Sequence, residues 1–97
     1  MVAYVMLLNW TDQGIKNVKD SPKRLDAVKK LAKELGGEVK SFYMTLGLYD
    51  LVLILDMPNN DKQAAFALKL GSSGNVRSTT LKAFPEEDYR RILGTLV

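Results

Sequence analysis

The pattern of apolar and polar residues predicts four strands. They cover Tyr4 to Trp10, Val39 to Leu46, Tyr49 to Met57 and Val76 to Phe84. The first and third belong to unbroken apolar runs, Val2 to Leu8 and Leu51 to Leu55, which is typical of strands buried on both faces. The second strand mixes apolar and polar residues, and the fourth is polar and rich in threonine. Both patterns favour positions at the edges of a sheet.

A helix is predicted between the first and second strands. Ser21 is expected to be its N-cap and Pro22 its first residue, and Gly36-Gly37 is expected to end it. Its apolar residues recur at intervals of three and four and form one stripe: Leu25, Val28, Leu31 and Leu35. The polar stretch before Ser21 has room for one helical turn.

Two further helices follow the third and fourth strands. The segment Asp61 to Leu70 is rich in alanine, lysine, glutamine and leucine, which favour a helix. Pro85 and three acidic residues then open a short final helix, where the acids match the positive end of the helix dipole. The apolar side of this last helix consists of Tyr89, Ile92, Leu93 and Leu96.

The order of these elements is β-α-β-β-α-β with a C-terminal helix. We therefore predict an α+β protein of the ferredoxin-like class, with one four-stranded antiparallel sheet and the first and third strands at its centre. The chain has 97 residues, which is enough for one small domain over residues 1–97 and leaves no room for a second.

The hairpin between the second and third strands predicts which face of the sheet is covered. We place Gly47 first in a two-residue type II′ turn, so that Leu46 faces Tyr49. One face then carries three further pairs, which are Met44 with Leu51, Phe42 with Leu53 and Lys40 with Leu55. The other face carries four, which are Thr45 with Asp50, Tyr43 with Val52, Ser41 with Ile54 and Val39 with Asp56. The first set is nearly all apolar, and we assign it to the helices.

The second face is expected to be open, because only the short final helix remains to cover it. It still carries Tyr43, Val52 and Ile54. An exposed apolar patch of this kind marks a surface for a partner or ligand. A second copy of the chain is the simplest cover, through a two-fold interface, and a small molecule held between this face and the final helix is the other candidate.

Composition excludes several kinds of chemistry. The chain has no cysteine and no histidine, so disulfides, thiolate nucleophiles, zinc sites built from Cys or His, and a histidine general base are all excluded. We predict no metal site and no cofactor. No apolar run approaches the ~20 residues that span a bilayer, and no basic segment precedes the first run, so we expect a cytoplasmic protein without a membrane segment.

Charge gives little support for a nucleic-acid partner. The formal net charge is +3, and residues 16–40 hold eight basic and four acidic residues, which is typical of a solvated helix face. RNA-recognition motifs share the strand order, but their third strand carries aromatic residues that stack on bases. Here that strand is Tyr49 to Leu55, with aspartate, leucine, valine and isoleucine after the tyrosine, and we expect no nucleic acid to bind.

Four short segments together resemble the GYD domain family. They are Asn9 to Gly14, Lys19 to Pro22, Gly47 to Asp50 and Gly74 to Arg77. The resemblance covers nearly the whole chain. It implies a dimeric α/β barrel, in which two ferredoxin-like subunits pair sheet to sheet, and it implies no particular reaction. More loosely, Gly47 to Asp50 and Asn75 to Thr79 are similar to the effector-binding domains of Lrp/AsnC regulators, which bind small molecules at subunit interfaces.

Seven residues are candidates for binding, and one of them for catalysis. They are Asn9, Trp10, Tyr43, Thr45, Tyr49, Asp50 and Arg77. Asp50 interrupts an apolar run, so its carboxylate either accepts hydrogen bonds from Thr45 or backbone amides, or contacts a ligand as an acid or base. Trp10 and Tyr43 suit an interface or a pocket, and Arg77 suits an exposed edge strand or an anionic ligand.

Three interpretations stay open on these grounds, the third being a purely structural role in which dimerisation alone fills the open face. The first is a homodimeric module that binds, senses or carries a small molecule. The second is a cofactor-independent enzyme, oxygenase-like or isomerase-like, in which Asp50 is the acid–base candidate; the resemblance to dimeric α/β barrels permits it.

Overall fold

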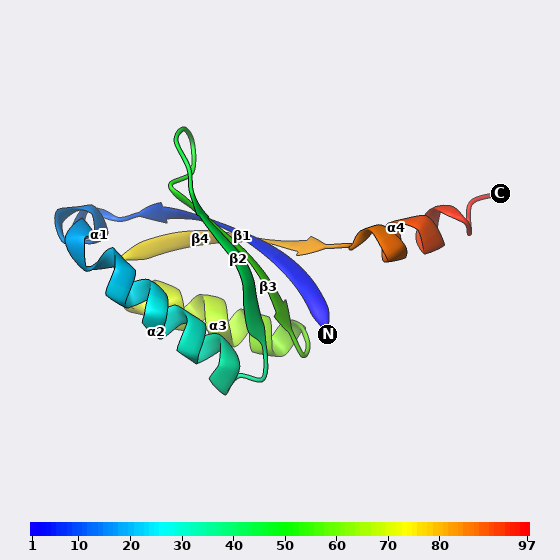
Figure 1. The fold of residues 1–97 in the computed structure, drawn as a ribbon, viewed down its shortest axis with the longest axis horizontal. Helices are drawn as coiled ribbons and strands as arrows, with labels where there is room; N and C mark the ends of the chain where they lie inside the picture. Colours follow the sequence, from blue (N-terminus) through cyan, green and yellow to red (C-terminus); the bar gives the residue numbers. More distant parts are fainter.

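The computed structural model describes all residues, 1–97, and contains the predicted sheet (Figure 1). Four antiparallel strands lie in the order β2-β3-β1-β4. Their bounds are β1 Val2–Trp10, β2 Glu38–Met44, β3 Leu51–Met57 and β4 Val76–Ala83. The ferredoxin-like α+β fold is therefore confirmed, with the two most apolar strands, β1 and β3, at the centre and the two more polar strands at the edges.

The longer helices both lie on one face of this sheet (Figure 1). These are α2, Ser21–Glu34, and α3, Asn60–Ser72. A short α1, Asp12–Lys16, and a 3-10 turn, Val18–Asp20, connect β1 to α2, and the last helix is α4, Glu86–Leu93. Every helix that the pattern predicted is present.

The two ends of α2 differ in how well the sequence predicted them. At its C-terminus, Gly36 has a φ of +87°, and the amides of Gly36 and Gly37 donate to the carbonyls of Lys33 and Ala32. This is the Schellman arrangement expected of a glycine cap. At its N-terminus, the prediction of Ser21 as N-cap was wrong. Ser21 is already helical, because the 3-10 turn leads directly into α2, and Asp20 is the N-cap without a side-chain hydrogen bond.

The core lies between the sheet and these two helices. Its members are exposed to 8% or less: Tyr4, Met6, Leu8, Ala32, Leu51, Leu53, Leu55, Met57, Phe66 and Leu70. Alternate residues of β1 and β3 thus point into the core, as strands with a period of two require. Among them, the Tyr4 hydroxyl donates to Asn60 Oδ1 at the start of α3, and burial raises the pKa of this tyrosine.

The hairpin register is confirmed near the turn and fails at the far end of β2. Phe42 faces Leu53 and Tyr43 faces Val52, as predicted. A β-bulge between Val39 and Ser41 then shifts the pairing, so that Val39 faces Leu55 and packs against the core. The predicted pairs of Val39 with Asp56 and of Lys40 with Leu55 were wrong because a bulge adds one residue to a strand.

The turn itself is also looser than predicted. β2 ends at Met44 and β3 begins at Leu51, so the loop covers residues 45–50. The Thr45 amide donates to the Asp50 carbonyl (2.8 Å) and closes this loop, and Gly47 has the positive φ expected of a turn glycine, +123°. Leu46 and Leu48 at the tip are 97% and 88% exposed. In Figure 1 the loop projects beyond the sheet.

The second face of the sheet is open, as expected. Ile54 is 37% and Tyr43 59% exposed, and Val52 is half-buried, although all three lie in or beside the centre of the sheet. Val5 of β1 faces Ile54 on one side and Leu81 of β4 on the other, which extends the apolar surface across three strands. We call this the open face, and define its apolar part as Val5, Leu7, Tyr43, Val52, Ile54 and Leu81.

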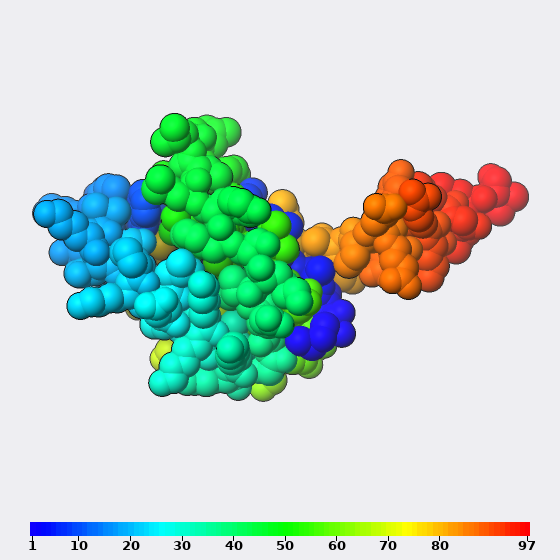
Figure 2. All heavy atoms as spheres, in the orientation of Figure 1, coloured from blue at the N-terminus to red at the C-terminus, as the bar shows by residue number.

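The C-terminal helix does not approach the open face of its own chain. Figures 1 and 2 show α4 projecting from the end of β4, away from the sheet. Its apolar side is exposed, with Tyr89 at 56% and Leu93 at 44%. The expectation that a ligand lies between this helix and the sheet within one chain was therefore wrong. The extended segment before Pro85 continues the direction of β4 and leads the chain outward.

Candidate functional site

The segments that resemble the GYD family meet at one end of the sheet. The Thr11 amide donates to the Asn75 carbonyl (3.0 Å), and the Gln13 side chain donates to the Ser73 carbonyl and to Asn75 Oδ1. The loop after β1 is thereby attached to the loop before β4. Both loops lie where β1 and β4 pair, so residues far apart in the sequence surround Trp10, the last residue of β1.

Gly14 lets α1 lie directly on the second of these loops. It is buried, and a Cβ atom added there would lie 2.0 Å from the carbonyl oxygen of Asn75. No side chain fits at such a distance. Glycine at this position is thus required by packing, and it sets how closely the loop of residues 73–75 approaches α1.

The hairpin loop is attached to the same end of β1. The Trp10 amide donates to Asp50 Oδ2 (3.0 Å), the Asp50 amide donates to the Leu8 carbonyl (2.9 Å), and Asn9 Nδ2 donates to the Leu48 carbonyl (2.8 Å). The Thr45 hydroxyl donates to the Tyr49 carbonyl rather than to the Asp50 carboxylate. The Asp50 carboxylate therefore adds one hydrogen bond beyond the end of the β1–β3 ladder. Its partner is a backbone amide, which is one of the partners expected for this carboxylate from the sequence.

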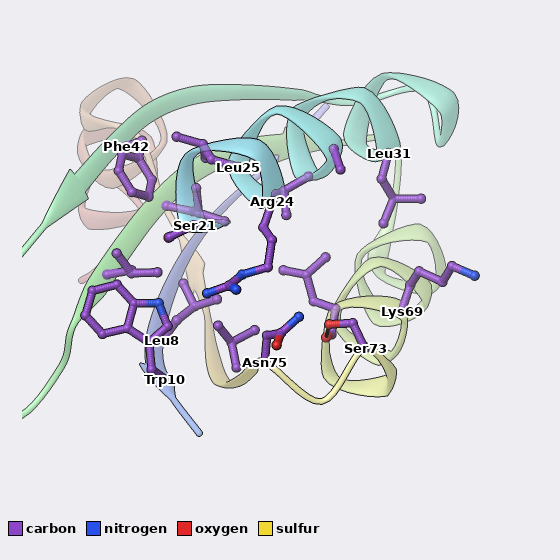
Figure 3. A pocket seen from close by; sticks show the side chains of 16 residues that line it. Leu8, Trp10, Ser21, Arg24, Leu25, Leu31, Phe42, Lys69, Ser73 and Asn75 are labelled. Carbon is purple, nitrogen blue, oxygen red and sulfur yellow. Dashed lines mark hydrogen bonds between the residues drawn. The ribbon is translucent and has the colours of Figure 1, made fainter. Parts of the chain in front are cut away.

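Beneath this end of the sheet, on the helix side, lies a cavity of about 300 Å³ (Figure 3). Its walls are mostly apolar side chains from α2, α3 and all four strands, Leu25, Val28, Phe42 and Leu70 among them. A volume of this size lies at the lower end of the range for small-molecule sites, roughly 300–1,000 Å³, and those sites share the same mostly apolar lining.

Two polar side chains reach into one end of the cavity. Figure 3 shows the indole nitrogen of Trp10 and the guanidinium of Arg24 pointing toward each other there, with Asn75 beside them. Trp10 Nε1 is buried and has no hydrogen-bond partner. Arg24 donates to the carbonyls of Asn17 (3.0 Å) and Gly14 (3.1 Å) and takes part in none of the ion pairs of the chain.

The predicted site residues thus separate into three groups. Trp10 lines the cavity. Asn9 and Arg77 line a second, polar hollow on the surface together with Trp10, Asp12 and Gln13. Thr45, Tyr49 and Asp50 form the base of the hairpin loop, and Tyr43 lies on the open face; none of these four lines either hollow.

Sequence reasoning missed the other polar residues of the cavity. Ser21 and Asn75 belong to the family-like segments, which was a usable signal. Arg24 was counted with the solvated basic residues of α2, and its position three residues after Ser21 gave no hint that it turns inward. No group of three or more acidic side chains lies close enough to hold a metal ion, and none of the helices is both long and apolar enough to cross a membrane.

Comparisons with known proteins agree with this architecture. A family model described as GYD domain matches residues 4–93. The chain is 32% identical over 89 residues to a protein of Thermus thermophilus, with 91% of this chain and 94% of that protein covered. That protein is named "Glutamine synthetase and cystathionine beta-lyase binding protein".

Two crystal structures share the fold. TTHA0845 from Thermus thermophilus has a TM-score of 0.55 and 23% identity, covering 88% of this chain and 95% of that one. The leucine response regulatory protein of Mycobacterium tuberculosis, LrpA, has a TM-score of 0.57 and 14% identity, covering 87% of this chain and 51% of that one. The second match agrees with the looser likeness to Lrp regulators.

Proposed function

The chain belongs to the GYD domain family, and from this membership we propose that it is a homodimeric binding protein that holds a small molecule and docks on a metabolic enzyme. The observation that carries the homodimer is the open face, an apolar surface in the middle of the sheet that no element of the chain covers. Binding is favoured over catalysis because the carboxylate of Asp50, the acid–base candidate, is already engaged by the Trp10 amide.

A second copy of the chain suits the open face in charge as well as in apolar character. Arg77 pairs in register with Asn9 at one end of this face, and Asp56 pairs with Ala3 at the other end. Neither side chain forms an ion pair within the chain. In a two-fold pairing with opposed strand directions, Arg77 of each copy approaches Asp56 of the other.

The same pairing gives α4 a partner. This helix is too short to be stable alone in water and has no contact surface on its own chain. Because it projects from the edge strand beside the open face, a second copy stacked on that face brings another surface within its reach. Tyr89, Ile92 and Leu93 then pack against the second copy.

Docking on an enzyme is suggested by the name of the Thermus thermophilus relative, which refers to glutamine synthetase and cystathionine beta-lyase. We assign the contact to the tip of the hairpin loop, where Leu46 and Leu48 are almost fully exposed and do not belong to the hydrophobic core. Large apolar side chains in that position are costly unless a partner covers them. Docking on such enzymes requires a cytoplasmic protein, which is the compartment that we propose.

The docking experiment uses surface plasmon resonance with purified glutamine synthetase and cystathionine beta-lyase from the source organism. We expect the wild type to bind at least one of them and the double variant Leu46→Ser/Leu48→Ser to lose binding. Leu68→Ser is the matched control, since Leu68 is 74% exposed on α3 and far from the hairpin. Absence of binding to both enzymes, or unchanged binding by the double variant, contradicts the docking role.

The small-molecule role rests on the cavity between the sheet, α2 and α3. Native mass spectrometry of the protein as purified tests it directly. A retained mass that heating or denaturant releases supports the role. A protein that is always free of any bound molecule, and that binds none of the probes described below, contradicts it.

A further inference from the structure

The cavity beneath Trp10 has a chemical asymmetry that indicates what it binds. Most of its lining is aliphatic or aromatic, whereas Trp10 Nε1 and the Arg24 guanidinium lie together at one end (Figure 3). We infer that the cavity takes a small carboxylate with an apolar body, whose acid group lies against Trp10 and Arg24 and whose body lies along α2 and α3. This inference rests on the small-molecule role proposed above.

The unpaired indole nitrogen of Trp10 calls for an acceptor. A buried N–H without an acceptor loses its hydration without compensation, so nearly all buried donors in folded proteins have partners. Trp10 Nε1 has none within the chain, although it borders a cavity large enough for a guest. An acceptor oxygen supplied by a ligand satisfies it.

The positive charge of Arg24 selects an anion. Its guanidinium is held in place by the Asn17 and Gly14 carbonyls, which leaves further N–H donors free. No acidic side chain neutralises it. Lys69 also belongs to the lining, but in Figure 3 its amine points away from the cavity, so Arg24 supplies the positive charge at the acid end.

The apolar character of the remaining wall selects an apolar body. Leu25, Val28 and Leu31 follow one another along the cavity-facing stripe of α2, and Leu70 of α3 belongs to the same lining. None of these offers a hydrogen bond. A sugar, a nucleotide or a second charged group would therefore lose its hydration without compensation there.

The test is a titration followed by the fluorescence of Trp10, the only tryptophan of the chain. Three probes share one chain length and differ in the head group: octanoate, 1-octanol and octylammonium. We expect a saturable change with octanoate, binding of 1-octanol that is weaker by about tenfold or more, and no saturable change with octylammonium. Equal affinity for octanoate and octanol, or stronger binding of octylammonium, overturns the inference.

Variants locate the site. Arg24→Gln is expected to weaken octanoate binding by about tenfold or more while octanol is little affected. Lys23→Gln removes the same charge from an exposed neighbour outside the lining and is expected to bind octanoate as the wild type does. An octanoate affinity that is unchanged in folded Arg24→Gln, or equally reduced in Lys23→Gln, contradicts the assignment.

Arg24 also binds the carbonyls of Gly14 in α1 and of Asn17 just after it, so a second variant is needed in case Arg24→Gln unfolds. Val28→Phe fills the cavity without touching its polar end, and it is expected to abolish octanoate binding. Retained binding in Val28→Phe overturns the inference. If native mass spectrometry finds a guest without an acid group, the ligand class fails while the small-molecule role stands. If no guest and no probe binds, both fail.

Discussion

Both faces of the two central strands carry large apolar side chains, but the two faces have different surroundings. Leu55 and Ile54 are neighbours on β3, yet Leu55 is fully buried under α2 and α3 whereas Ile54 is 37% exposed on the open face. Packing within the chain explains the first residue and offers no reason for the second. The difference supports the proposal that a partner covers the open face, because an exposed apolar patch in the middle of a sheet is typical of an interaction surface.

The largest expected effect comes from truncating one side chain on each face. Leu55→Ala should lower the free energy of unfolding by about 2–5 kcal/mol, because it leaves a void in a fully packed core. Ile54→Ala should lower it by less than about 1 kcal/mol in the single chain and instead weaken self-association. Denaturant unfolding at several protein concentrations separates the two quantities. If Leu55→Ala and Ile54→Ala lose the same free energy of unfolding at high dilution, the predicted difference between the two faces is contradicted.

A second prediction concerns the end of the sheet where α1 closes over the covered side. Gly14→Ala should destabilise the fold by up to about 3 kcal/mol, since the new methyl group meets a backbone oxygen that has little freedom to move. Gly71→Ala is the matched control, because a Cβ at Gly71 meets nothing within 4 Å. Thermal melting of both variants checks the contrast, and a Gly14→Ala variant as stable as Gly71→Ala would refute it.

A third prediction tests the residue that connects the hairpin loop to β1. Asp50→Ala should cost about 1–2 kcal/mol, because the half-buried Trp10 amide loses its acceptor. Asp50→Asn keeps an oxygen acceptor and should lose clearly less stability than Asp50→Ala. Chemical denaturation of the pair is the measurement. Wild-type stability in Asp50→Ala would mean that the carboxylate has no structural role and would reopen its candidacy as an acid or base.

The smallest effect at neutral pH belongs to Tyr4 on the covered face. Tyr4→Phe removes the hydrogen bond to Asn60 and should cost about 0.5–1.5 kcal/mol. Because burial raises the pKa of Tyr4 above the ordinary 10.0, the unfolded chain loses this proton first. The stability from the neutral phenol is therefore complete below pH 10 and is lost as the pH rises through the folded-state pKa.

Melting curves between pH 8 and pH 11 check the sign of this dependence. The wild type should lose stability more steeply above pH 10 than Tyr4→Phe does. Parallel curves for the two proteins would contradict the assignment of the raised pKa to Tyr4.

The sequence predicted the parts of the fold that depend on local patterns. Continuous apolar runs placed β1 and β3 at the centre, and Gly36-Gly37 predicted the end of α2, because strand burial and glycine caps are properties of short segments. The alternation around Tyr43 and Val52 likewise predicted which face is open. These features require only a period of two or of three to four and a few turn residues.

Features that depend on distant contacts were not predictable. The bulge that turns Val39 into the core is invisible in a strand that mixes apolar and polar residues. The path of α4 was not predictable from its amphipathic pattern, since α4 projects away from the sheet and packs on no other element of the chain. Arg24 looks like any other basic residue of α2, and only the fold shows that it reaches the cavity beside Trp10.

Sedimentation equilibrium tests most directly whether the open face is an interface. At low micromolar concentration, the wild type should have twice the mass of one chain. Val52→Lys, which places a charge in the middle of the open face, should have the mass of one chain, whereas Ala64→Lys, the same kind of change on the exposed side of α3, should remain a dimer. A wild type with the mass of one chain at all concentrations, or a folded Val52→Lys variant that remains a dimer, would contradict the account.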